Sequence, residues 1–215
     1  MLKKLFRARF SKGDANDARS LESPADLTAG DLVTFKHRLA LPGDVQGQTF
    51  EVSSVGAYEF EDGLYPQLTL DGAESGRIFL SFKAGDVSEL CLSREVPRRD
   101  VLKLFDEDAF SALWDDDFAD LQVVSRLDAY DGWLADAYSQ VKKWAEGYYH
   151  SRDQRGETLS QYADDDSEEL RYHECEDASG RFGITVEVWG DGETEVTLDV
   201  NVAPDVVDAL FPGTS

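Results

Sequence analysis

The clearest pattern in the chain is a strict alternation of apolar and polar residues near its C-terminal end. Over residues 182–188 and 196–202, every second residue is apolar. Alternation with a period of two residues is typical of strands that bury one face, and Gly190-Asp191-Gly192 between them suits a tight turn. The pattern predicts an antiparallel hairpin, to which residues 170–176 add a third strand.

A second region of alternation covers residues 31–95 and predicts a β-meander. The apolar phase slips at Ser53-Ser54, shortly before Gly56, which indicates a bulge or a sharp bend. Short strands at regular spacing with glycine-rich turns favour a small barrel or a sandwich. The predicted strands lie around residues 32–39, 48–60, 68–70, 78–82 and 90–92.

Between these regions the apolar period changes to that of a helix. Asp106 can cap a short helix that carries Phe110, Leu113 and Trp114 on one face. A strand is predicted within residues 121–127, and a short helix after Pro204. The strongest helical signal is a stripe of about four turns that predicts a long amphipathic helix; its members are Leu134, Ala137, Tyr138, Val141, Trp144, Ala145 and Tyr148.

These elements together predict an α+β protein. The expected architecture is an N-terminal antiparallel β-meander or small barrel and a C-terminal antiparallel hairpin sheet with one long amphipathic helix. Residues 31–97 would form the barrel-like unit and residues 98–215 the α+β unit. Residues 13–30 are small, polar and aperiodic, as in a linker.

The first twelve residues differ from the rest in charge. They hold five basic residues and no acidic one, although the whole chain has a net charge of −23. On a helical wheel most of their apolar residues share one side, which is typical of segments that lie on an anionic membrane or a protein partner. The alternative is a solvated N-terminus. The predicted contact residues are Leu2, Lys3, Lys4, Leu5, Phe6, Arg7, Arg9 and Phe10.

The overall acidity narrows the classes of partner. A field of this sign repels nucleic-acid phosphates, so no nucleic-acid partner is predicted. No apolar run approaches the length of a membrane span, no signal peptide is recognisable, and the two cysteines make no disulfide framework. The cytoplasm is the expected location, with contact to the inner face of the membrane through a basic arm formed by residues 1–12.

Candidate metal ligands occur in two groups, but neither has the spacing of a known site. Acidic clusters lie at residues 106–120 and 164–169, without the glycine and terminal glutamate that an EF-hand requires. A zinc site would need His150, His173 and Cys175 together with Cys91 from the other half of the chain. Solvated acidic segments and ordinary strand side chains are the preferred interpretations, and no metal or cofactor is predicted.

No segment carries a signature of catalysis. The chain lacks a Gly-x-Ser-x-Gly nucleophile turn and a glycine loop that could cradle a phosphate. Trp189 is unusual because it falls on the polar phase of its strand, on the same face as Glu187. Packing under the predicted helix at residues 130–148 is the preferred explanation, and an exposed contact surface is the alternative.

Several strand and turn segments form a pattern that is found in a known group of proteins. They are Gly30-Asp31-Leu32-Val33, Phe50-Glu51-Val52, residues 56–63, Leu68-Thr69-Leu70, Ile78-Phe79-Leu80, residues 184–188 and residues 192–196. These segments resemble uncharacterised bacterial barrel-like domains of unknown function, of the YjfK-like kind, which are encoded near phage-shock genes of the PspA type. The resemblance implies an accessory role near the membrane, beside a coat-forming PspA-like protein, and transfers no catalytic residue.

The expected function is therefore that of a non-enzymatic accessory protein that binds a protein partner at the membrane periphery. One alternative is an acidic inhibitor that mimics nucleic acid or covers a basic protein surface. Another is a metal-dependent enzyme whose carboxylate site has no recognisable signature.

Overall fold

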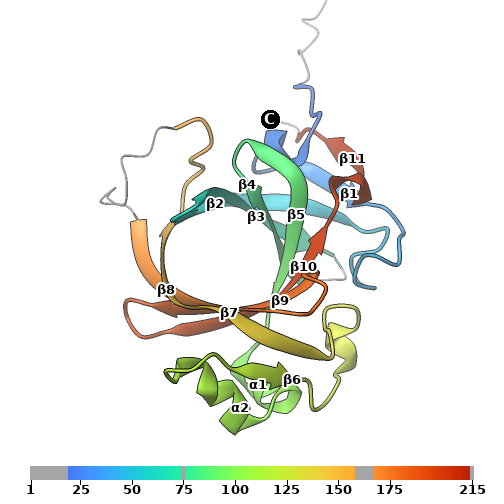
Figure 1. Ribbon diagram of the computed structural model, residues 1–215. Coiled ribbons are helices and arrows are strands. Elements are labelled where there is room, and N and C mark those ends of the chain that lie inside the picture. The colour runs from blue at the N-terminus through green and yellow to red at the C-terminus, as the bar shows by residue number, and fades with distance from the viewer. Residues whose placement is uncertain (1–18, 74–75, 158–166, 214–215) are drawn as a thin grey trace, which may run out of the picture.

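The computed structural model describes residues 19–73, 76–157 and 167–213. Within these residues eight antiparallel strands form a closed barrel, because the last strand of the series pairs back with the first. Figure 1 looks into this barrel approximately along its axis. In order around the wall the strands are β2 (Thr49–Phe60), β3 (Gly63–Gly72), β4 (Gly76–Lys83), β5 (Asp86–Glu95), β10 (Thr194–Val202), β9 (Phe182–Trp189), β8 (Ser167–Glu176) and β7 (Ala137–His150).

The other elements lie outside the barrel wall. β1 (Leu32–Phe35) and β11 (Val207–Phe211) extend the sheet beyond β2, and β6 (Asp120–Gln122) pairs with β7. The helices α1 (Arg98–Leu104) and α2 (Glu107–Ser111) lie near β6, below the barrel in Figure 1. Short 3-10 turns occupy Pro24–Asp26, Ala112–Trp114, Asp128–Tyr130 and Pro204–Val206.

The hydrophobic core lies between the barrel wall and these outer elements. Leu80, Leu92 and Leu198 project outward from their strands and are fully buried. They belong to one apolar cluster with residues of the covering segments, such as Phe35 and Trp133. Because neighbouring residues of a strand point to opposite faces, the polar residues between these leucines point into the barrel. The barrel is therefore apolar outside and polar inside.

The predicted α+β class is wrong, because the described residues form mostly antiparallel sheet with only two short α-helices. The stripe at residues 134–148 belongs largely to β7 instead of a long helix. The register of β7 against β8 shifts twice, between Gln140 and Lys142 and between Lys142 and Ala145, and Trp144 adopts a left-handed φ of 50°. These bulges interrupt the two-residue period, so the apolar side chains recur at a spacing that imitates a helix.

The predicted helix after Pro204 is also wrong beyond its first turn. The 3-10 turn is followed directly by β11, which pairs with β1. Three other predictions are confirmed. They are the hairpin of β9 and β10, the bulge between Val52 and Ser54, and the N-terminal cap of α2 by Asp106. The Asp106 carboxylate accepts hydrogen bonds from the Asp108 and Ala109 amides at 3.1 and 3.0 Å.

The barrel closes along a short seam between β2 and β7. Four residue pairs form it, from Ala57 opposite His150 to Phe60 opposite Gly147. Glycines let the two strands approach each other. A Cβ atom on Gly56 would lie 2.5 Å from the Tyr149 hydroxyl and 2.8 Å from the His150 carbonyl, and one on Gly147 would lie 2.8 Å from the Phe60 ring. Among the described residues, no helix has the length and apolar character that crossing a membrane requires.

Candidate functional site: the barrel lumen

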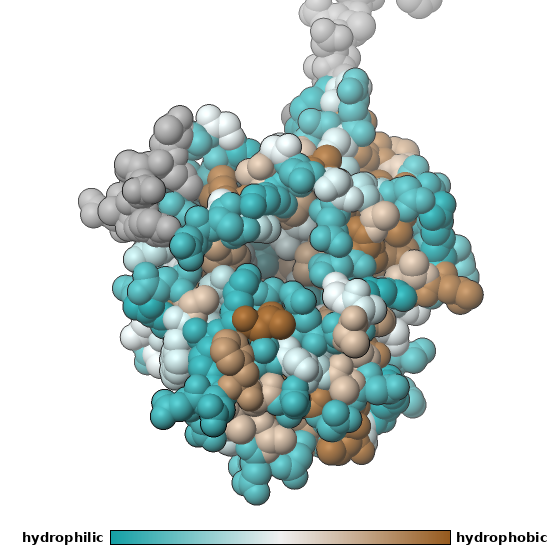
Figure 2. Space-filling view, in the orientation of Figure 1, coloured by the Kyte–Doolittle hydropathy of each residue, from teal (hydrophilic) through white to brown (hydrophobic). Residues whose placement is uncertain are grey.

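The lumen of the barrel is a cavity of about 760 Å³, lined by inward-pointing side chains from all eight strands of the wall. In the space-filling view, largely hydrophilic residues surround the hollow at its mouth (Figure 2). Alternation places these side chains, since each is a sequence neighbour of an outward residue of the core. The lumen has two chemically distinct sides, one aromatic and one rich in hydroxyls and carboxylates.

The aromatic side comes from β2, β3, β7 and β8, and Trp189 at the end of β9 adjoins it. Tyr58 and Phe60 are stacked with ring centroids 5.5 Å apart, and Phe60 lies 4.7 Å from Tyr172. Tyr149 contacts Tyr58 at 4.9 Å and meets the edge of Trp189 at 6.0 Å. The result is a continuous aromatic surface that can pack against methylene groups, planar rings or cations.

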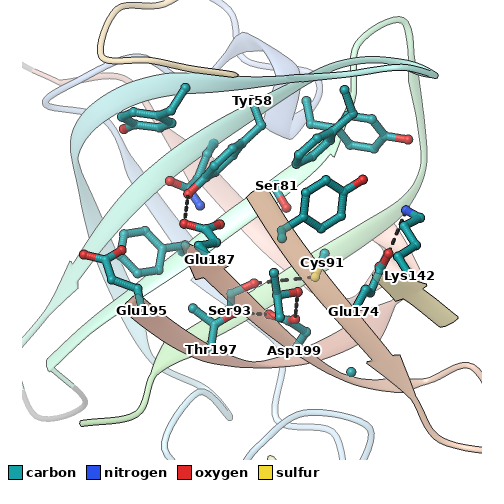
Figure 3. Close-up of a pocket in the computed structure, with 18 of the residues that line it drawn as sticks. Tyr58, Ser81, Cys91, Ser93, Lys142, Glu174, Glu187, Glu195, Thr197 and Asp199 are labelled. Atoms are coloured by element: carbon teal, nitrogen blue, oxygen red, sulfur yellow. Dashed lines mark hydrogen bonds and ion pairs between the residues drawn. The ribbon is translucent and has the colours of Figure 1, made fainter. Parts of the chain in front are cut away.

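The opposite side comes from β5, β9 and β10 and centres on Asp199. Its two carboxylate oxygens accept hydrogen bonds from the Thr185 hydroxyl at 2.7 Å and the Thr197 hydroxyl at 3.0 Å (Figure 3). Asp199 is only 9% exposed, and this burial raises the pKa of its carboxyl despite the hydroxyl donors around it. A carboxylate with neutral donors alone is incompletely compensated for the water that it loses.

Glu187 is the second buried carboxylate of the lumen. It is 8% exposed, and it accepts a hydrogen bond from the Tyr58 hydroxyl at 3.1 Å. Figure 3 shows this bond extending from the aromatic side toward the carboxylate side. Burial raises the pKa of Glu187 to about 8. The hydrogen bond from Tyr58 lowers this pKa, whereas the nearby negative charge of Glu195 raises it further. Glu195 is the residue directly opposite Glu187 in the β9–β10 ladder.

The charges of the lumen are strongly unbalanced. Among the described residues that line it, eleven are aspartate or glutamate and one, Lys142, is basic. The Lys142 ammonium forms an ion pair with Glu174 at 2.6 Å. Burial alone would lower the pKa of Lys142, but the Glu174 carboxylate outweighs it and the pKa is raised. The one cation is therefore already neutralised by a carboxylate of its own.

The lumen thiol is not poised for nucleophilic chemistry. Cys91 lies beside Ser93, with its sulfur 3.6 Å from the serine hydroxyl. Burial, together with the charge of Asp199, raises the pKa of the Cys91 thiol. A reactive cysteine needs a lowered pKa, so the surroundings of Cys91 favour an inert thiol.

The residues that the sequence singled out as metal ligands are scattered through the fold. His173 and Cys175 are buried on the outer face of β8, where the His173 ring packs between Trp114 and Trp144 at 5.3 and 4.6 Å. His150 lies 3.2 Å from Glu59 near the seam. Cys91 lines the lumen, away from both. In the part of the chain that the structure describes, no cluster of three or more such residues is placed to hold a metal ion.

The basic arm and the two acidic clusters are the remaining predicted sites. The predicted contact residues Leu2 to Phe10 of the basic arm lie outside the described residues, as do Asp164, Asp165 and Asp166 of the second acidic cluster. The cluster at residues 106–120 lies around α2 and β6, on the outside of the barrel.

The sequence interpretation missed the lumen itself. Trp189 lines the cavity instead of packing under a helix, and Glu187 beside it is buried instead of solvated. The signal was present, because both residues lie on the polar phase of an alternating strand. A tryptophan on that phase indicates that the polar face is also enclosed.

Comparisons of the chain with protein-family models, with curated proteins and with solved structures found no match.

Proposed function

We propose that this protein is a non-enzymatic binding protein whose barrel lumen holds a small organic molecule. The observation that carries the proposal is a closed wall around a cavity of about 760 Å³, lined by aromatic rings on one side and by hydroxyls and carboxylates on the other. Ligand sites in proteins commonly have volumes of roughly 300–1,000 Å³, and eight-stranded barrels can enclose one small ligand.

The composition of the lumen supports binding over a purely structural role. An eight-stranded barrel can be filled by apolar side chains, which would stabilise the fold. Here the wall instead encloses Glu187 and Asp199, and burying carboxylates without a counter-charge costs free energy. The stability of the fold does not require carboxylates inside the barrel, whereas the binding of a polar ligand does.

Binding also agrees better than catalysis with the state of the reactive groups. The Thr185 and Thr197 hydroxyls both donate to Asp199, and the described lining residues include no histidine that could act as a general base for them. The raised pKa of the Cys91 thiol disfavours the thiolate. The predicted contact of residues 1–12 with a membrane or a partner is a separate part of the proposal, and it would place the barrel at that surface.

The proposal can be tested by a ligand screen with a variant that fills the lumen. Thermal stabilisation would be measured against a panel of cationic, neutral and anionic metabolites for the wild type, for Ser81→Trp and for Val124→Trp. Ser81 lines the cavity, whereas Val124 is 61% exposed on the outside. We expect ligands that stabilise the wild type and the Val124 variant to lose their effect on Ser81→Trp. A panel without any stabilising compound, or hits that Ser81→Trp retains, would contradict the proposal.

A further inference from the structure

We infer that the ligand of the lumen is a linear polyamine, whose ammonium groups occupy separate carboxylate subsites along β10. This inference rests on the proposed function, since it names the class of molecule that the lumen would take. Three observations carry it: the sign of the lumen charge, the spacing of the buried carboxylates, and the aromatic surface opposite them.

The sign of the charge selects a cation. Eleven carboxylate side chains face one lysine among the described lining residues, and that lysine is paired with Glu174. Neither Glu187 nor Asp199 has a basic side chain of the described chain within ion-pair distance; their partners are the hydroxyls of Tyr58, Thr185 and Thr197. An anionic ligand would be repelled, whereas a cationic ligand supplies the counter-charge that both carboxylates lack in their ionised forms.

The spacing of the carboxylates selects a molecule with more than one positive charge. Glu187 and Glu195 are opposite each other in the β9–β10 ladder and form one subsite. Asp199 lies four residues further along β10 and forms a second, with Thr185 and Thr197 between them. At roughly 3.3 Å per residue the backbone positions of Glu195 and Asp199 are about 13 Å apart. An extended triamine has its terminal nitrogens at a comparable separation, whereas a monoamine reaches only one subsite.

The aromatic surface suits the methylene segments between the charges. Tyr58 on β2 reaches the first subsite through its hydroxyl (Figure 3), and Tyr172 on β8 lies directly beside Glu187 in the β8–β9 ladder. Phe60 contacts both rings and also lines the lumen. Apolar methylenes gain from contact with the rings, and an ammonium over a ring face gains further from cation–π attraction.

A bare divalent cation fits the same region less well. Calcium and magnesium need several oxygen ligands that converge at short distance. The described residues bring no three potential ligand side chains together in this way. The carboxylates are spread along the strands, which matches a long flexible cation better than a point charge.

The test is isothermal titration calorimetry with spermidine at an ionic strength of about 0.15 M, where nonspecific attraction to the acidic surface is screened. The variants are Glu187→Gln and Asp199→Asn, and Asp116→Asn is the charge-matched control on an exposed site outside the barrel. We expect each lumen variant to weaken spermidine binding about tenfold or more, as for loss of a charge-assisted contact, and the control to change it less than about twofold. Putrescine, which cannot span both subsites, should bind more weakly than spermidine.

Different results separate this inference from the proposed function. Equal weakening by Asp116→Asn and the lumen variants would reveal surface binding and overturn the inference. If a neutral sugar or an aromatic metabolite binds, loses affinity in Ser81→Trp and is not displaced by spermidine, the inference fails and the proposed function stands. If no compound of any charge binds in the lumen, both fail. Should Asp199→Asn not fold, Glu187→Gln and Glu195→Gln test the first subsite without it.

Discussion

Asp31 and Asp199 show that burial to a similar extent can leave the pKa of an aspartate lowered or raised, depending on whether its donors outweigh the loss of water. Asp31 is 2% exposed, and burial alone would raise its pKa. Its oxygens accept from the Thr28 amide at 2.7 Å and the Gly213 amide at 2.8 Å, and Arg19 adds an ion pair, so the pKa of Asp31 is lowered. Asp199 has hydroxyl donors instead of an ion pair, and its pKa is raised.

A prediction at this scale concerns the link that Asp31 makes between the two ends of the described chain. We expect Asp31→Asn to lower the free energy of unfolding by roughly 1–3 kcal/mol. The NH2 group of the asparagine would face an N–H donor whose hydrogen bond the aspartate oxygen accepts. Urea denaturation at neutral pH would measure it, with Asp208→Asn on an exposed site as the control. The pKa of Asp31 is lowered from 3.8, so its contribution is present above that value and lost as the pH falls below it. The difference between wild type and variant should shrink as the pH falls below 3.8, and a difference that does not change would contradict the explanation.

At the scale of elements, the seam between β2 and β7 depends on the absence of a side chain at Gly56. We expect Gly56→Ala to lower the free energy of unfolding by about 1–3 kcal/mol, because the new methyl group would overlap the Tyr149 hydroxyl and the His150 carbonyl. Gly43→Ala is the matched control, since a Cβ atom there meets nothing within 4 Å. Thermal denaturation of both variants would measure the effect, and equal melting temperatures would show that the seam relaxes without cost.

Strands with regular alternation, and β2 with its single register shift, were predictable from the sequence, whereas β7 with two register shifts was not. β9 and β10 keep a two-residue period throughout, so their pairing could be inferred from local residues and one turn. In β7 the left-handed Trp144 and two register shifts displace the apolar positions by one residue at a time. The pairing with β8, not the local pattern, determines that this segment is extended, and pairing between distant segments is not visible in one sequence.

At the scale of the whole molecule, the enclosed carboxylates predict an unusual dependence of stability on pH. The folded protein binds a proton at Glu187 more tightly than the unfolded chain, because the pKa is about 8 instead of 4.5. The free energy of unfolding should therefore fall as the pH rises between these values, by an amount on the order of a few kcal/mol. Glu195 and Asp199 on β10 act in the same direction, and Tyr58 on β2 and Glu95 on β5 are the other titratable groups whose interactions influence Glu187.

Urea denaturation from pH 5 to pH 8.5 would test this dependence, with Glu187→Gln as the comparison. We expect a weaker fall for the variant, since an amide has no proton to lose. Burial lowers the pKa of His173, which adds stability as the pH rises toward 6.5, but both proteins keep this contribution. Identical slopes for the wild type and the variant would contradict the assignment to Glu187.

The candidate site was not predictable, because its existence depends on closure of the barrel. A polar residue on an alternating strand can face solvent or a lumen, and the local pattern is the same in both cases. Whether these residues face solvent or a lumen is determined by the pairing of residues 57–60 with residues 147–150, which are about ninety positions apart in the sequence. The sequence indicated the strands and the excess of carboxylates, while the enclosure of Glu187 and Asp199 emerges only in three dimensions.

The placement of the core outside the barrel has a consequence for the evolution of this fold. In most small domains a substitution that alters a binding cavity also disturbs the packing that holds the domain together. Here the leucines and valines that stabilise the wall face the covering segments, and the residues that meet a ligand occupy the opposite face of the same strands. Side chains of the lumen can therefore change with little loss of stability, so that one scaffold can acquire new specificities through a few inward positions.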